Sequence, residues 1–295
     1  MRVAFLGLGA IGTPMATHVA KQHQLIVWNR TAARAAEFAE RHGATVASSP
    51  REAAAAAEVV ITCLPTSSDV ASLLDGPDGL LAGLARGSLF LDCTSGDPEA
   101  TRQIGARLAP LGIEFADAPV SGGTNGAEAG TLTVMVGATE AVFARARPIL
   151  ECFGRRVEHM GPLGAGHAMK AVNNALLAVN VLAVGEGLTA LVKSGIEARK
   201  AVEVLNASSG RSFVSEYLVP QRVLTRMWPL TFRLALLDKD ARIAAEFLGA
   251  QGISGPVLHL TSDLLAAARK ALGEEADYLE PIRLVEQEAG VELHE

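Results

Sequence analysis

A lysine and an asparagine stand four residues apart in a stretch of the chain that carries almost no other charge. Lys170 and Asn174 follow a glycine-containing run at 162–166, and the sequence then stays apolar to residue 192 except for asparagines and Glu186. Residues four apart project from one face of a helix, so an ammonium and a carboxamide would point the same way. Such a pair could donate a proton to a substrate oxygen and orient the substrate. On spacing alone, a snorkelling lysine and an asparagine that caps a neighbouring backbone group explain the pair equally well.

A glycine pattern near the N-terminus indicates a dinucleotide site. Residues 2–6 form an apolar run of strand length, a Gly-x-Gly-x-x-Gly pattern follows at 7–12, and a helical segment continues to about residue 21. This order of strand, glycines and helix is what the dinucleotide fingerprint requires. Gly7 permits the tight turn, Gly9 lets the backbone approach a pyrophosphate, and Gly12 lets helix and strand pack closely. We therefore expect the cofactor phosphates at the helix N-terminus, against Gly7, Leu8, Gly9, Ala10, Ile11 and Gly12.

The residues after the second strand indicate which cofactor is used. The predicted strand 24–28 ends in Asn29, Arg30 and Thr31, where an NAD-preferring fold usually carries an acidic residue for the ribose 2′-hydroxyl. A guanidinium beside an amide and a hydroxyl suits a 2′-phosphate, which a carboxylate would repel. The sequence therefore favours NADP over NAD. Alternatively, Arg30 only begins the exposed basic face of the next helix.

Strands and helices continue to alternate up to residue 161, which predicts a doubly wound, mostly parallel sheet. Two apolar strands end near Leu64 and Pro65 and near Thr94 and Ser95. Because ligands lie beyond the carboxyl ends of such strands, we expect these four residues to border the cofactor. Cys63 and Cys93, at the same edge, are expected to be small buried hydrophobic residues.

A Ser-Gly-Gly tripeptide follows the predicted strand 113–118. Ser121, Gly122 and Gly123 could expose consecutive backbone N–H groups and a hydroxyl, which together would bind a carboxylate. Taken alone, the same tripeptide could equally be a flexible turn.

After residue 161 the pattern changes to helices separated by Gly, Ser or Pro. We predict two domains: a Rossmann-like NADP-binding domain at 1–161, and at 162–295 a long interdomain helix with an all-α domain for substrate binding and oligomerisation. Within the second domain, Lys239 lies among apolar neighbours beside Asp238 and Asp240. On sequence alone, a surface ion pair explains this lysine as well as a functional role does.

Composition excludes several classes of function. A formal net charge of −6 argues against a nucleic-acid or membrane-surface role. The three cysteines show no metal-binding spacing, so we expect no metal site and a reducing, cytoplasmic location, with no signal peptide. The apolar run 171–192 is interrupted by asparagines and Glu186, so we expect a buried helix rather than a membrane span.

Four motifs in the same order give the chain a resemblance to the β-hydroxyacid dehydrogenase family over essentially its whole length. They are GLGAIGTPM at 7–15, DAPVSGG at 117–123, GAGHAMKAVNN at 164–174, and Lys239-Asp240. The resemblance implies that Lys170 is the catalytic acid/base and that Ser121, Gly122, Gly123 and Asn174 hold the substrate. It also implies that Lys239 lies at the boundary of nicotinamide and substrate, in contact with both, and that Ser95 contacts the nicotinamide half. The sequence departs from the family at Ile11, usually methionine, and at His167, for which we expect a structural role.

The resemblance implies hydride transfer between NADP(H) and a small carboxylate-bearing β-hydroxy acid or semialdehyde, such as 3-hydroxyisobutyrate and methylmalonate semialdehyde. Glyoxylate, succinic semialdehyde and tartronate semialdehyde are alternative substrates, and residues around Arg211, Ser212 and Phe232 are expected to select among them. An imine reductase or a non-catalytic nucleotide-binding module are alternatives of other classes. The family and the apolar helical domain suggest a homodimer or homotetramer.

Overall fold

A computed structural model describes residues 1–294 of the chain. Contacts within the chain divide it into two compact units, Met1–Lys170 and Ala171–Glu295, with the division inside the long helix α8 (Ala165–Lys193). The division therefore falls somewhat beyond residue 161, where the sequence pattern changes. Each unit is described below by itself.

Unit 1 is built on one sheet with the strand order β3-β2-β1-β4-β5-β6-β8-β7, and β9 pairs with β8. Strands β1 to β6 are parallel to one another, whereas β8 runs antiparallel to β6 and β7 and parallel to β9. The strands are β1 (Arg2–Leu6), β2 (Gln24–Trp28), β3 (Thr45–Val46), β4 (Val59–Thr62), β5 (Leu89–Asp92), β6 (Glu114–Asp117), β7 (Val120–Ser121), β8 (Leu132–Gly137) and β9 (Gly154–Gly161).

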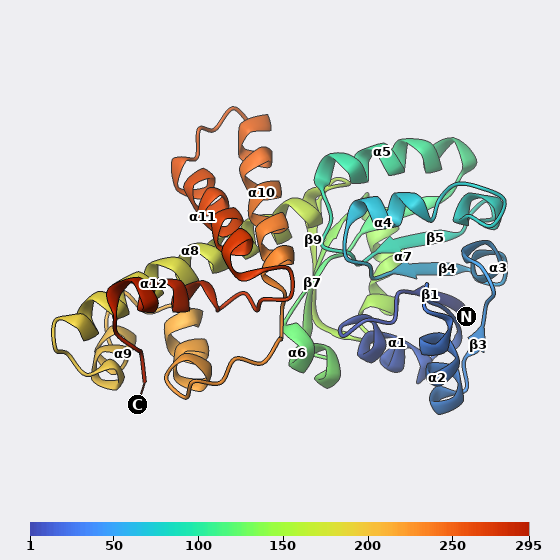
Figure 1. Cartoon of the computed structure of the whole chain (residues 1–295). Coiled ribbons are helices and arrows are strands. Elements are labelled where there is room, and N and C mark those ends of the chain that lie inside the picture. Colours follow the sequence, from blue (N-terminus) through green and yellow to red (C-terminus); the bar gives the residue numbers. More distant parts are fainter. Residues whose placement is uncertain (295) are drawn as a thin grey trace. The chain divides into compact units, whose positions relative to one another are not determined.

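Side chains alternate across the sheet and fill two cores. Along β1, Val3 and Phe5 enter one core, and Ala4 and Leu6 enter the other. The first core is covered by α1 (Gly12–Ala20), α2 (Ala32–His42) and α7 (Glu140–Leu150). The second is covered by α3 (Pro50–Ala55), α4 (Ser67–Ser72) and α5 (Pro98–Leu108) (Figure 1). Helices on both faces explain why β4 and β5 read as continuous apolar runs, and they confirm the predicted doubly wound sheet.

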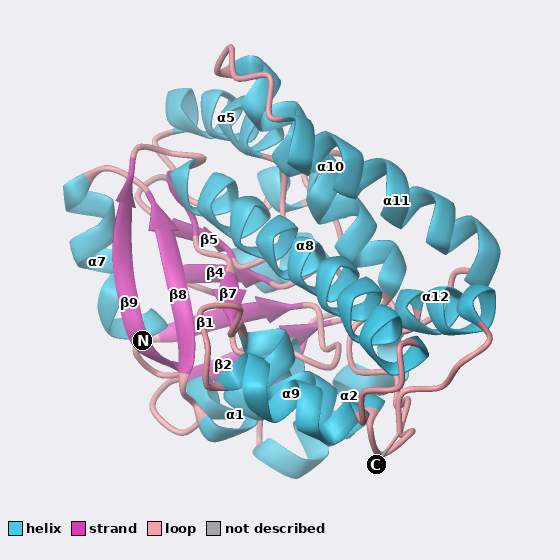
Figure 2. Cartoon of the chain, turned by 90° about the vertical axis from the view of Figure 1, so that its left-hand side faces the viewer, coloured by secondary structure: helices cyan, strands magenta, loops and turns pink. Residues whose placement is uncertain are grey.

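Unit 2 is helical, as predicted. After α8 it contains α9 (Ala198–Asn206), η3 (Val214–Val223), α10 (Leu234–Ala250), α11 (Pro256–Leu272) and α12 (Pro281–Ala289) (Figure 2). The element η3 is a π-helix, a form that the sequence pattern did not predict. Pro220 inside it has no N–H to donate, and Leu224 N donates five residues back to Val219 O.

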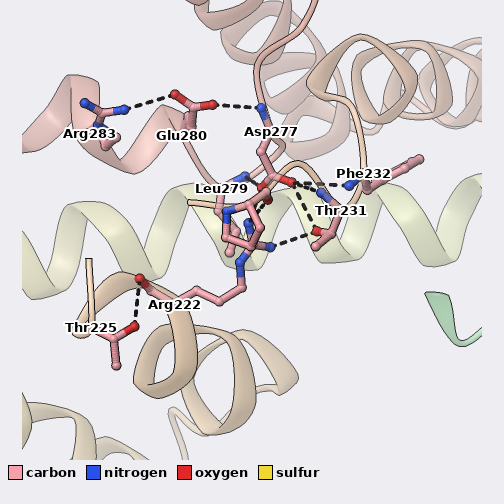
Figure 3. A network of polar contacts seen from close by, with 9 residues as sticks. Arg222, Thr225, Thr231, Phe232, Asp277, Leu279, Glu280 and Arg283 are labelled. Carbon is pink, nitrogen blue, oxygen red and sulfur yellow. Dashed lines mark hydrogen bonds and ion pairs between the residues drawn. The ribbon is translucent and has the colours of Figure 1, made fainter. Parts of the chain in front are cut away.

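A buried ion pair joins η3 to the segment before α12. Arg222 Nη2 lies 2.9 Å from Asp277 Oδ1, and Asp277 is only 1% exposed. Asp277 Oδ2 accepts from Thr231 N and Phe232 N, and its Oδ1 accepts from Leu279 N (Figure 3). A single carboxylate therefore satisfies donors from three segments, which fixes the entry into α10.

Helix α8 leaves apolar surface uncovered in the single chain. It has 29 residues, and its most apolar window has a mean hydropathy of 1.9, so by length and composition alone it could cross a membrane. Only 33% of that window is buried within the chain, so α8 is less buried than we expected.

Candidate active site

The glycine loop has the geometry of a phosphate-binding turn. Gly7 has φ +106°, and a Cβ there would overlap Cys63 O; a Cβ on Gly12 would overlap Gly7 O. A Cβ on Gly9 would meet no protein atom within 4 Å. Packing within the protein therefore requires Gly7 and Gly12 but does not require Gly9, whose open side fits a ligand that approaches the backbone. This is the arrangement that a dinucleotide pyrophosphate needs.

The side chain of Asn29, the residue that follows β2, is hydrogen-bonded to this glycine loop. Its Oδ1 accepts from Leu8 N at 3.0 Å, and its Nδ2 donates to Thr31 O at 3.1 Å. Sequence reasoning grouped Asn29 with Arg30 and Thr31 as cofactor contacts and did not foresee this bond to the glycine loop. The position of Asn29, 21 residues after Leu8 and at the end of the strand beside β1, is the only signal that the sequence offers.

The Arg30 side chain is 87% exposed, and its Nη1 lies 3.9 Å from Asp69 Oδ1. Asp69 is held by a 2.6 Å hydrogen bond from Thr66 Oγ1, the N-cap residue of α4. The guanidinium is thus open to solvent but has a fixed carboxylate beside it.

The loops after β4 and β5 are tied together by Asp92. Its Oδ1 accepts from Thr62 Oγ1 at 2.8 Å and from Thr94 N at 3.1 Å, and Leu64 N donates to Thr94 Oγ1 at 3.1 Å. Thr94 is 1% exposed, so its side chain lies inside the protein, where it holds the loop after β4 through Leu64 N. Pro65 is exposed and Ser95 is half-buried at the same edge.

The two cysteines at this edge have thiol pKa values above the usual value. Cys93 is 2% exposed, and burial raises the pKa of its thiol well above the usual value. Burial, with Asp92 nearby, raises the pKa of the half-buried Cys63 to about 12. Both thiols are free, and residues 1–294 contain no group of three or more His, Cys, Asp or Glu side chains that could hold a metal ion.

The Ser-Gly-Gly segment forms regular secondary structure and is not the flexible turn that was the alternative interpretation. Val120 and Ser121 form β7, and α6 (Gly123–Ala129) begins directly after Gly122. Gly122 has φ +138° and Gly123 has φ +63°, so both adopt conformations that other residues rarely take. The assignment of these residues as a carboxylate site remains a prediction.

Asp117 anchors the first turn of α8, which leads to Lys170. The carboxylate at the end of β6 accepts from Gly164 N and His167 N, both at 2.7 Å. Burial raises the pKa of Asp117, while the two backbone donors oppose that shift. A Cβ on Gly166 would overlap Met135 O, so this glycine allows α8 to start against β8. Lys170 is only 8% exposed, and it follows directly after a helical turn that these hydrogen bonds hold in place.

A second buried carboxylate joins the two predicted substrate residues of unit 2. Asn174 Nδ2 donates to Asp240 Oδ2 at 2.6 Å, and Lys239 Nζ lies 3.0 Å from Asp240 Oδ1. Asp240 and Asn174 are 2% and 4% exposed. The structure thus rules out a surface ion pair for Lys239, whose side chain is 12% exposed. Sequence reasoning noted the Lys-Asp pair but did not foresee that Asp240 also holds Asn174.

The expected substrate-selecting residues of unit 2 lie in the segments around η3. Ser212 N donates to Ser215 Oγ at 2.9 Å, and Phe232 N donates to Asp277 Oδ2 at 3.2 Å. The Phe232 ring packs edge-on against Tyr278, and Arg211 is exposed. Their backbone positions are fixed, and their role in substrate choice remains a prediction.

Comparisons with known proteins find relatives that match nearly the whole chain. A family model described as the NAD binding domain of 6-phosphogluconate dehydrogenase matches residues 2–161, and one described as NAD-binding of NADP-dependent 3-hydroxyisobutyrate dehydrogenase matches residues 164–285. The chain is 35% identical over 295 residues to 2-(hydroxymethyl)glutarate dehydrogenase of Eubacterium barkeri, covering 99% of this chain and 97% of that protein. It is 38% identical to an NAD-dependent L-serine dehydrogenase of Pseudomonas aeruginosa, covering 94% and 95%. A solved structure of Mycobacterium tuberculosis 3-hydroxyisobutyrate dehydrogenase with L-serine has a TM-score of 0.87 at 32% identity, covering 96% and 98%.

Proposed function

Because this chain belongs to the β-hydroxyacid dehydrogenase family, we propose that it interconverts a small β-hydroxy acid and its semialdehyde with NADP(H). The favoured pair is 3-hydroxyisobutyrate and methylmalonate semialdehyde. Glyoxylate, succinic semialdehyde and tartronate semialdehyde are the alternative substrates for reduction. The observation that carries the proposal is a buried lysine, Lys170, one helical turn before Asn174, on a helix whose first turn is bonded to Asp117.

When bound, NADPH would supply the hydride to the aldehyde carbon. Lys170 would donate a proton to the carbonyl oxygen as it becomes a hydroxyl, and would take that proton back in the oxidation. The N–H groups and hydroxyl of Ser121, Gly122 and Gly123 would hold the substrate carboxylate. Asn174 and Lys239, held by the same carboxylate of Asp240, would orient the reacting end of the substrate.

Two features support NADP as the cofactor, and one opposes it. The exposed Arg30 guanidinium and the absence of an acid at Asn29–Thr31 favour a 2′-phosphate, with Asn29 bracing the glycine loop. The carboxylate of Asp69 near Arg30 would weaken that preference through repulsion. We therefore propose that NADP is preferred and that NAD is also accepted.

The experiment is oxidation of NADPH and of NADH with a panel of carboxylate-bearing aldehydes and a cyclic imine, for the wild type, Lys170→Ala and Lys193→Ala. Lys193 is exposed at the end of the same helix and serves as the matched control. We expect Lys170→Ala to lose about 10²- to 10⁴-fold in kcat and to keep NADPH binding, with Lys193→Ala unchanged.

Ordinary turnover by Lys170→Ala would refute its role as the proton donor. Reduction of the imine alone would favour an imine reductase, and tight NADPH binding without any turnover would favour a non-catalytic module. An Arg30→Ala variant that loses affinity for NADPH but not for NADH would support the 2′-phosphate assignment.

We also propose that the chain forms a homodimer or a homotetramer. Unit 2 exposes apolar side chains on α8 and along one side of α11, namely Leu176, Val257, Leu260 and Leu264, which are 40 to 61% exposed. An apolar stripe of this kind favours self-association. Light scattering of the wild type beside Leu260→Glu tests this: a monomeric wild type would contradict the proposal.

A further inference from the structure

His167 is a fully buried histidine that the proposed chemistry does not use. Its side chain is 0% exposed, and it lies in α8 three residues before Lys170. Its backbone N–H donates to Asp117, and its ring Nδ1 lies 2.6 Å from Thr101 Oγ1 on α5. The residue therefore joins the start of α8 to two other elements of unit 1.

The hydrogen bonds of Thr101 favour one tautomer of the ring. Thr101 Oγ1 donates its single proton to Asp97 O at 2.9 Å. When this hydroxyl donates to Asp97 O, it accepts from the ring Nδ1–H of His167. In the neutral imidazole this leaves Nε2 as a bare acceptor, and Nε2 is buried without a hydrogen-bond partner among the described residues. Thr101 is thus the only described hydrogen-bond partner of the ring.

The ring also packs against the turn that follows Ser95. A Cβ on Gly96 would lie 2.7 Å from His167 Cε1 and 2.7 Å from Ser67 Oγ, so only glycine leaves room for the imidazole there. The next residue is held as well, because Asp97 N donates to Ser67 Oγ at 2.8 Å. The turn is therefore enclosed between the imidazole of α8 and the serine of α4.

We propose that His167 is a positioning residue that fixes the turn carrying Ser95 relative to the helical turn carrying Lys170. The inference rests on the proposed function, in which Ser95 meets the nicotinamide half of the cofactor and Lys170 donates the proton. Both reacting partners would then be located by one imidazole and its bond to Thr101. A misplacement of reacting groups by about 1 Å can slow an enzyme by about 10²-fold. We therefore expect loss of the His167–Thr101 hydrogen bond to lower the rate more than the affinity for the cofactor.

Thr101→Val removes the hydroxyl at nearly constant shape, and Thr101→Ser retains it. We expect Thr101→Val to lower kcat by about 10- to 100-fold, as loss of an outer partner of a site residue commonly does. The primary deuterium isotope effect with 4-deuterated NADPH should increase, because hydride transfer becomes slower, while the dissociation constant of NADPH stays within about threefold. Thr101→Ser should restore all three quantities.

His167→Asn and Gly96→Ala probe the same contact from its other sides. Asn places an amide N–H near the position of Nδ1 and should keep more activity than His167→Leu, which has no donor. Gly96→Ala crowds the ring and should reproduce the lower kcat and the larger isotope effect.

A lower melting temperature in Thr101→Val with unchanged kcat and isotope effect would show a purely structural role and overturn the inference. The ¹⁵N signals of the imidazole give a readout independent of turnover. The Nδ1 signal should shift in Thr101→Val, which removes its hydrogen-bond partner, and an unchanged Nδ1 signal overturns the inference even in an inactive protein. Failure of the proposed function would appear differently, as ordinary turnover by Lys170→Ala.

Discussion

Replacement of Asp240 by asparagine tests whether one buried carboxylate holds Asn174 and Lys239, the two predicted substrate residues of unit 2. Asp240 uses separate oxygens for its two partners, with Lys239 Nζ 3.0 Å from Oδ1 and Asn174 Nδ2 2.6 Å from Oδ2. Asparagine has one acceptor oxygen, so Asp240→Asn can keep only one of the two contacts and faces the other partner with an amide N–H.

The magnitude follows from the burial of the pair. At 3.0 Å and an effective dielectric constant of about 20, the Coulomb attraction between Lys239 and Asp240 is about 5 kcal/mol, much of it offset by desolvation. Removing one partner of a buried pair usually costs about 3–5 kcal/mol. Because one hydrogen bond survives, we expect a loss of about 3 kcal/mol in the free energy of unfolding of unit 2. If a substrate hydrogen bond worth about 1.4 kcal/mol is also lost, the KM for the aldehyde rises about tenfold.

The assay can isolate unit 2, because the chain has two tryptophans, Trp28 in unit 1 and Trp228 in unit 2. In a Trp28→Phe background, urea unfolding followed by tryptophan fluorescence reports on unit 2. Asp263→Asn, an exposed aspartate on α11, is the matched control for loss of one negative charge. An Asp240→Asn variant whose unfolding midpoint and KM equal those of the control would refute the reasoning.

Three further outcomes are expected. Asp277→Ala should reduce the stability of unit 2 by about 3–5 kcal/mol in the same fluorescence assay, because it leaves the buried Arg222 guanidinium without its carboxylate; an unchanged midpoint would contradict this. Gly9→Ala should weaken NADPH binding without changing the melting temperature, whereas Gly12→Ala should lower both, since only the second Cβ overlaps protein atoms; fluorescence titration and thermal melting separate the two. Because burial raises its pKa, the Cys93 thiol stays protonated at mildly alkaline pH, so iodoacetamide should label it far more slowly in native than in urea-unfolded protein, and equal rates would argue against its burial.

The fold was predictable because its signals are local. A doubly wound sheet is predicted by short stretches of sequence alone, namely the glycines at 7 and 12 and the apolar strands β4 and β5. The helix α6 was not predicted because Gly122 and Gly123, which have positive φ at its start, are also typical of a flexible turn. The π-helix around Pro220 was missed because propensities do not distinguish a widened helix from an ordinary one.

The braces of the site could not be predicted in the same way. Asp117 accepts from residues 47 and 50 positions further along the chain, and the Asn174–Asp240 bond spans 66 positions. An acidic residue at the end of a strand or inside a helix is ordinary in sequence, and only the tertiary fold decides which donors reach it. The sequence therefore indicated Lys170, Asn174, Lys239 and the neighbouring Asp240, but not that Asp240 also holds Asn174 or that Asp117 holds the start of α8.

These carboxylates are better explained by positioning than by stability. A buried charge is expensive unless it is fully paired, and replacing a buried ionic group with apolar residues of similar volume is often neutral or stabilising. In unit 1, both oxygens of Asp117 accept hydrogen bonds from the backbone at the start of α8, the helix that carries Lys170. In unit 2, both oxygens of Asp240 contact side chains, one that of Asn174 and the other that of Lys239. Apolar side chains could fill the same volumes but could not set the direction of an N–H or an ammonium. We infer that Asp117 and Asp240 are buried despite the cost of desolvation because the proposed hydride and proton transfer depends on where these donors point.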